Sequence, residues 1–99
     1  MVGIYWTKEA KLWLKEIHDY ISEDNIITAR KTINKIIQKT EILKTFPESG
    51  SKLEEFKSRK IRYILYKHYR IVYWQKSADR IDILGVYHGS LDLKRHFKL

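Results

Sequence analysis

The sequence predicts an α+β domain in which a two-helix hairpin packs on one face of a small, mainly antiparallel, four-stranded sheet. Apolar residues recur at helical spacing through the first half of the chain, whereas residues 59–88 follow the pattern of β-strands. A chain of 99 residues has room for one core between two layers, so we expect a single domain over residues 1–99.

The first strand and the first helix follow each other directly at the N-terminus. Residues 2–6, VGIYW, are β-branched and aromatic, which is typical of a short strand. Thr7 can then cap a helix, and Glu9 places a negative charge in the first turn, where the helix dipole favours one. Apolar residues at helical spacing predict that this helix continues for about four turns: Ala10, Trp13, Leu14, Ile17, Tyr20 and Ile21.

A second helix follows a short polar break, SEDN, at residues 22–25. Its apolar pattern ends near Pro47. Because proline disfavours a helical residue before it, we expect this helix to stop by Thr45 or Phe46. A connection as short as this break makes the two helices antiparallel neighbours with facing apolar stripes.

After a loop at residues 47–58, the pattern changes from helical to alternating. Strands are predicted at residues 59–66, 69–74 and 80–88, and the last is apolar on both sides at its centre, as an interior strand should be. The links between these strands are short enough for hairpins. The predicted order is therefore β-α-α-β-β-β, followed by a short C-terminal tail or turn.

The cationic excess lies in the half of the chain that forms most of the sheet. The net charge is +1 over residues 1–50 and +7 over residues 51–99. Since the helix hairpin can cover only one face of the sheet, we expect the other face to be bare, with Arg and Lys interleaved with Tyr and Trp. Such a surface favours a nucleic acid or an acidic protein as partner.

Several classes of protein are disfavoured by the composition. No apolar run approaches the roughly 20 residues that span a bilayer, and the N-terminus lacks the features of a signal peptide. We therefore expect no membrane partner and a cytoplasmic location. Cysteine is absent, and the four histidines share no ligand spacing: His18, His68, His88 and His96. We therefore expect neither a metal nor another cofactor.

Four motifs in this order resemble the RelE/ParE superfamily of bacterial toxins, and the resemblance covers almost the whole chain. They are WTKEAKLWLKEIHDYI, LKTFPESGSKL, YRIVYW and RIDILGVYHGSLD. The ending VYHGSLDLKRHF is similar to that of the ParE branch. The residues at the matching positions are Val86, His88, Ser90, Leu91 and Asp92.

The resemblance implies the toxin of a type II toxin–antitoxin module, neutralised by a cognate antitoxin in a hetero-oligomer. ParE members are described as poisons of DNA gyrase that stabilise its cleaved complex with DNA, and RelE members as nucleases that cut messenger RNA in the ribosomal A site. A ParE-like protein, which we favour, would have no catalytic residues of its own. A basic nucleic-acid binder outside any toxin system stays open as a third class.

The alternative is a RelE-like, metal-independent endoribonuclease that uses Arg62, Arg70 and His88. Arg70 resembles the phosphate-contacting arginine of RelE-type nucleases, and a histidine can act as acid or base near neutral pH. The paired strand lysines of RelE do not carry over, because the matching positions are Ile61 and Tyr63.

The resemblance also implies an acidic antitoxin whose disordered segment folds as it binds, adding a helix in a groove beside the helix hairpin. Antitoxin contacts are expected at Tyr5, Arg59, Arg62, Tyr69 and Arg70. The C-terminal end has been implicated in the toxicity of ParE-like proteins. Trp74 shares one side of its predicted strand with Arg70 and is a second candidate region. Contacts with the target, gyrase or else the ribosome and messenger RNA, are expected at Trp74, His88, Lys94 and Arg95.

Overall fold

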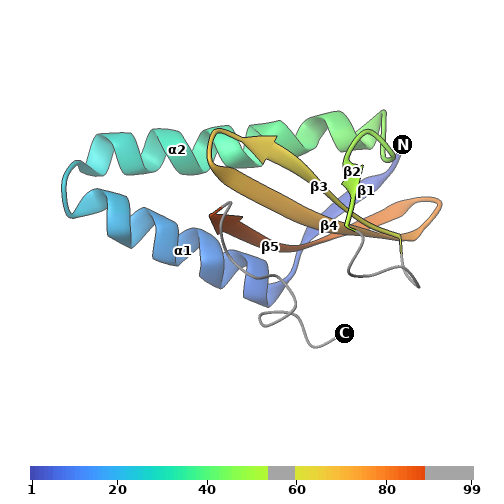
Figure 1. The fold of residues 1–99 in the computed structure, drawn as a ribbon, viewed down its shortest axis with the longest axis horizontal. Helices are drawn as coiled ribbons and strands as arrows, with labels where there is room; N and C mark the ends of the chain where they lie inside the picture. Colours follow the sequence, from blue (N-terminus) through green and yellow to red (C-terminus); the bar gives the residue numbers. More distant parts are fainter. Residues whose placement is uncertain (54–59, 89–99) are drawn as a thin grey trace.

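The computed structural model describes residues 1–53 and 60–88. Its elements are, in chain order, β1 (Gly3–Trp6), α1 (Lys8–Ser22), α2 (Ile26–Lys39), the 3₁₀-helix η1 (Thr40–Lys44), β2 (Ser51–Lys52), β3 (Ile61–Tyr66), β4 (Tyr69–Ser77) and β5 (Arg80–His88). The strands form one sheet in the order β1-β5-β4-β3-β2 (Figure 1). β1 runs parallel to β5, and the other neighbours are antiparallel.

The predicted α+β fold is confirmed, with one strand more than expected. The additional strand is β2, whose two residues pair with Arg62 and Tyr63 at the edge of the sheet. Two residues within a polar stretch carry no alternation of apolar and polar side chains, so the pattern gave no sign of this strand. The predicted C-terminal tail, residues 89–99, lies outside the described part of the chain.

The helix ends follow the capping residues. The Thr7 hydroxyl accepts a hydrogen bond from the Ala10 N–H (3.1 Å) and donates one to the Ile83 carbonyl (2.8 Å), which ties the start of α1 to β5. Asn25 caps α2 by accepting from the Thr28 N–H (3.0 Å). The chain continues past Lys39 as a 3₁₀-helix, so the helical segment ends before Pro47 as expected. None of the helices in the described ranges has the length and apolar character needed to span a bilayer.

The main core lies between the helix hairpin and one face of the sheet (Figure 1). Full burial of an aliphatic side chain of this kind contributes about 1.5–3 kcal/mol, so this layer supplies most of the driving force for folding. Its buried residues are Val2, Ala10, Ile36, Leu43, Ile71, Tyr73, Ile81, Ile83 and Val86.

The opposite face of the sheet carries a second apolar cluster. Its buried members are Leu53, Ile61, Val72 and Tyr87. The expectation that this face is bare is therefore wrong at its centre, where Val72 and Tyr87 are almost completely buried. Arg70 lies beside this cluster, since it pairs with Tyr87 across the strands, and Tyr63 and Trp74 pack against it.

The second cluster is joined to the helices through Trp13 and Tyr87, whose ring centroids are 4.7 Å apart. β1 covers β5 only from Arg80 to Ile83, so it does not pair with the part of β5 that holds Tyr87. The Tyr87 ring lies directly over Gly85, where an added Cβ would approach it to 2.5 Å. Glycine at this position therefore makes room for the ring.

We predict that Gly85→Ala destabilises the fold by about 1–3 kcal/mol, because the buried Tyr87 ring cannot move aside without disrupting its packing on Trp13. Urea or thermal unfolding measures the change. Gly3→Ala is the matched control, since its Cβ would meet only the half-exposed Tyr5 ring, at 3.0 Å. Equal stability of the wild type and Gly85→Ala would contradict this account of the second cluster.

Candidate docking groove

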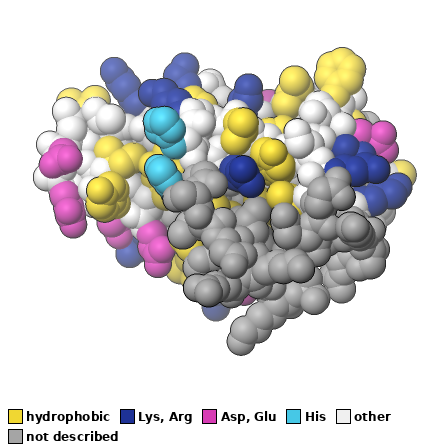
Figure 2. Space-filling model, viewed as in Figure 1, with side chains coloured by type: hydrophobic (Ala, Val, Ile, Leu, Met, Phe, Trp, Pro, Cys, Tyr) yellow, Lys and Arg dark blue, Asp and Glu magenta, His cyan; other side chains and the backbone are white. Residues whose placement is uncertain are grey.

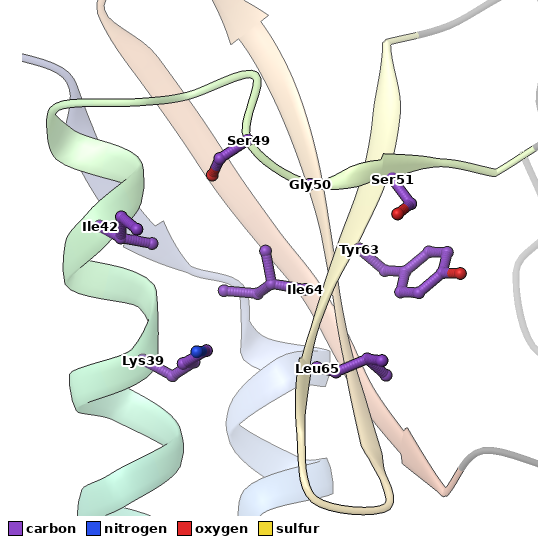
Figure 3. A pocket seen from close by; sticks show the side chains of 8 residues that line it. All are labelled: Lys39, Ile42, Ser49, Gly50, Ser51, Tyr63, Ile64 and Leu65. Carbon is purple, nitrogen blue, oxygen red and sulfur yellow. The ribbon is translucent and has the colours of Figure 1, made fainter.

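A cleft of about 360 Å³ lies between the C-terminal end of the helix hairpin and strand β3. Its lining residues are Lys39, Ile42, Ser49, Gly50, Ser51, Tyr63, Ile64 and Leu65 (Figure 3). The side chains of Lys39, Ile42 and Ile64 point into the gap between helix and strand, whereas Tyr63 and Leu65 point away from it (Figure 3). Ile42 is 47% exposed, so a partner in the cleft could bury it, and Leu65, 53% exposed, extends the apolar surface beyond the outer edge of the cleft.

One wall of this groove is a loop that the Tyr73 phenol holds in place. The Tyr73 hydroxyl donates a hydrogen bond to the Pro47 carbonyl (2.8 Å) and accepts one from the Gly50 N–H (3.0 Å). Burial raises the pKa of this phenol, so it stays protonated and able to donate at neutral pH. A strand in the core thus fixes a loop on the surface.

Arg62 adds a third hydrogen bond to the same loop, from its Nη1 to the Gly50 carbonyl (3.0 Å). The loop lies so close to the sheet that a Cβ at Gly50 would approach the Tyr73 hydroxyl to 2.6 Å and the Tyr63 carbonyl oxygen to 2.7 Å. Only glycine allows this approach of backbone to strand. Arg62 is therefore part of the groove wall.

The two arginines of the predicted nuclease site lie on opposite faces of the sheet. Arg62 pairs with Tyr73 and shares the face covered by the helices. Arg70 pairs with Leu65 and Tyr87 on the other face, and its guanidinium lies 4.8 Å from the centroid of the Tyr63 ring. Directly paired residues in an antiparallel sheet project to the same side, so the structure does not bring Arg62 and Arg70 together.

His88 lies at the end of β5, where it pairs with Tyr69. Its imidazole stacks on His68 with ring centroids 5.9 Å apart and meets the Tyr69 ring edge-on at 6.0 Å. Arg62 pairs four residues along β4 from Tyr69, about 13 Å along the strand. The three residues predicted for catalysis therefore do not converge on one point.

A family model described as the ParE toxin of the type II toxin–antitoxin system parDE matches residues 4–93. This chain belongs to the ParE toxin family. The predicted resemblance to the RelE/ParE superfamily, and to its ParE branch, is thereby confirmed.

A solved structure has the same fold as this ParE-family chain. It comes from the chromosomal ParDE toxin–antitoxin system of P. aeruginosa, with a TM-score of 0.71 and 20% sequence identity. The match covers 89% of this chain and 96% of that one. A search of curated proteins finds no match.

The remaining predicted contacts of this ParE-family chain are divided between the two faces. Tyr5, through its pairing with Asp82, lies on the same face as Trp74 and Arg70. The Arg80 guanidinium lies 4.4 Å from the centre of the Tyr5 ring and donates to Asp82 (2.9 Å). Lys76 lies 5.7 Å from the centre of the Trp74 ring.

Tyr69 and His88, in contrast, share the side on which the helices pack. The predicted contacts Arg59, Lys94 and Arg95 lie outside the described residues. Within residues 1–53 and 60–88, no three His, Asp or Glu side chains are grouped closely enough to hold a metal ion.

The groove residues Lys39, Ile42, Ile64 and Leu65 were not among the predicted contacts of this ParE-family chain. One signal was available in the sequence. Ile42 directly precedes the core residue Leu43 and so cannot share its side of the helix, yet it is apolar. An apolar residue on the outer side of a helix end indicates either chance exposure or a docking site.

We predict that Tyr73→Phe loosens the groove wall and lowers stability by about 1–3 kcal/mol, because the buried Gly50 N–H loses its acceptor. Amide hydrogen exchange should show faster exchange at Gly50, and urea unfolding measures the loss of stability. Tyr5→Phe, which removes the hydroxyl of a half-exposed tyrosine, is the control and should change neither. Unchanged exchange at Gly50 would show that the phenol does not hold the loop.

Proposed function

We propose that this ParE-family toxin is held inactive by a cognate antitoxin that lays an acidic, amphipathic helix into the groove between η1 and β3. The observation that supports this most is the half-exposed apolar side chain of Ile42, which points into a pre-formed cleft, with the half-exposed Leu65 at the outer edge of the cleft. A helix with apolar residues on one face would bury this surface, which is a common mode of peptide recognition.

The charge around the groove favours an acidic segment. α2 presents Lys31, Lys35 and Lys39 at successive turns, and all are exposed. The carboxylate of Glu41 is already paired with Lys44 (2.8 Å). Acidic residues on the antitoxin would therefore meet unlike charge along the whole helix, which speeds association and disfavours basic competitors.

Arg70 can belong to the same docking surface although it lies on the other face. Leu65 lines the groove and is also the direct cross-strand neighbour of Arg70. The apolar surface of the groove therefore continues around β3 to the face of Arg70. An antitoxin that extends beyond the groove would contact Arg62 on one side of the sheet and Arg70 on the other, in a toxin–antitoxin hetero-oligomer.

We predict that Ile42→Glu weakens antitoxin binding at least about tenfold, because it places a charge against the apolar face of the docked helix and adds repulsion to acidic residues. Calorimetric titration with the purified cognate antitoxin measures the affinity. Leu12→Glu is the matched control, because Leu12 is 54% exposed on α1 and does not line the groove. Equal affinities of both variants and the wild type would contradict this location for the antitoxin.

We further propose that the free toxin inhibits growth by binding DNA gyrase and stabilising its cleaved complex with DNA, without catalysis of its own. Two observations support this proposal over the nuclease. The chain belongs to the ParE family, and Arg62, Arg70 and His88 are not arranged to act on one phosphate. Trp74, His88, Lys94 and Arg95 are the proposed target contacts.

We predict that expression without antitoxin causes filamentation and a DNA-damage response while protein synthesis continues at first. The purified toxin should make cleaved DNA accumulate in a gyrase assay. Arg70→Ala should keep full toxicity, because a protein–protein inhibitor does not need this arginine to hold a scissile phosphate. Rapid arrest of translation with messenger RNA cut inside codons, abolished in Arg70→Ala, would instead establish the nuclease.

A further inference from the structure

The turn between α1 and α2 exposes large apolar side chains that the fold does not use. Tyr20 is 76% exposed, Ile26 53% and Ile27 63%. They flank the connector that contains Glu23 and Asp24, which are also exposed. We call these five residues the hairpin tip. The hairpin tip and the docking groove lie at opposite ends of α2. Ile27 in the tip and Lys39 in the groove are separated by about 18 Å along the helix.

The sequence of the hairpin tip opposes local helix stability. α1 has no basic residue in its last turn, and its C-cap is Glu23, although the helix dipole favours positive charge there. α2 has no acidic residue in its first turn, where it begins with Ile26 and Ile27. Asp24, which directly precedes the N-cap of α2, suits the start of that helix, but neither Glu23 at the end of α1 nor the exposed isoleucines are explained by the needs of the helices. Departures of this kind from local rules are expected where a surface is retained for binding.

The hairpin tip also has the opposite charge to the rest of the molecule. Residues 16–29 contain four acidic residues and no Lys or Arg, in a chain with a net charge of +8. Figure 2 shows acidic and apolar side chains gathered at the end of the molecule where α1 and α2 join. An acidic antitoxin helix would be repelled here, whereas a basic surface would be attracted.

One of the proposed target contacts lies toward the hairpin-tip end of the molecule. β5 carries the proposed target contact His88 at its last residue, and it runs toward the end of the molecule at which α1 and α2 join (Figure 1). There His88 meets the Tyr69 ring edge-on at 6.0 Å.

We propose that the hairpin tip docks the toxin onto its protein target, at a surface where Lys and Arg surround an apolar depression that accepts Ile26, Ile27 and Tyr20. This proposal rests on the proposed toxin function, because it adds a surface to the proposed target contacts at Trp74, His88, Lys94 and Arg95. The groove and the hairpin tip are then separate docking surfaces of opposite charge. The basic groove accepts the antitoxin, and the acidic hairpin tip contacts the target.

Two double variants test the proposal without weakening the helices. Ile26→Ala with Ile27→Ala removes the apolar contact and improves helix propensity. Glu23→Lys with Asp24→Lys reverses the charge; it suits the dipole at the end of α1 and opposes the dipole at the start of α2, so the two effects offset each other. Both double variants should therefore unfold near the wild-type temperature and bind the purified antitoxin with unchanged affinity. The toxin dose needed to inhibit growth should nevertheless rise about tenfold or more for both double variants.

Leu12→Ala is the matched control, because it truncates an equally exposed apolar residue elsewhere on α1 and should keep full growth inhibition. Full growth inhibition by both double variants would overturn the proposal. So would a loss of antitoxin affinity, or a free toxin with fewer subunits than the wild type has, since these would assign the hairpin tip to the antitoxin or to a second copy.

Binding to purified gyrase separates this proposal from the proposed function. Wild-type binding that both double variants lose supports the two together. If the double variants lose growth inhibition while the wild type does not bind gyrase, gyrase is the wrong target, and the hairpin tip is still the surface that meets the correct one. A wild-type chain that does not inhibit growth would overturn both.

Discussion

The register of β4 against its two neighbours is the constraint on which the rest of the structure depends. Because side chains alternate along a strand, this register places Ile71 and Tyr73 beneath the helices and Arg70, Val72 and Trp74 on the other face. A slip of one residue would exchange the two sets and expose the core. The same register carries the Tyr73 hydroxyl to the loop that forms the groove wall, so the binding surface depends directly on the packing of the core.

Much of this architecture can be predicted from the sequence, because long periodic segments have few alternative structures. The two helices and strands β3 to β5 belong to this class. The separation of the arginines could also have been predicted. The hairpin turn has two residues, Lys67 and His68, so even-numbered residues of β3 pair with odd-numbered residues of β4. Arg62 and Arg70 therefore fall on opposite faces, a result that treating each strand separately does not reveal.

The features that were missed depend on contacts between distant segments. β2 is two residues long and exists only because Ser51 and Lys52 lie along the edge of β3. The buried state of Val72 and Tyr87 depends on a second cluster that includes Trp13 from the first helix. The groove needs Ile42 and Ile64 to face each other across the gap between a helix end and a strand (Figure 3). Local pattern contains no information on such pairings.

The parallel pairing of β1 with β5 has a consequence for the order of events during synthesis. Gly3–Trp6 are synthesised before both helices and before β3 and β4, whereas their partners Arg80–Ile83 are synthesised after all of these. The sheet cannot close, nor the Thr7 hydroxyl reach its acceptor on β5, until residues 80–83 have left the ribosome. A translation product that stops before β5 therefore lacks the strand with which β1 pairs, and its N-terminal strand has no place in a sheet.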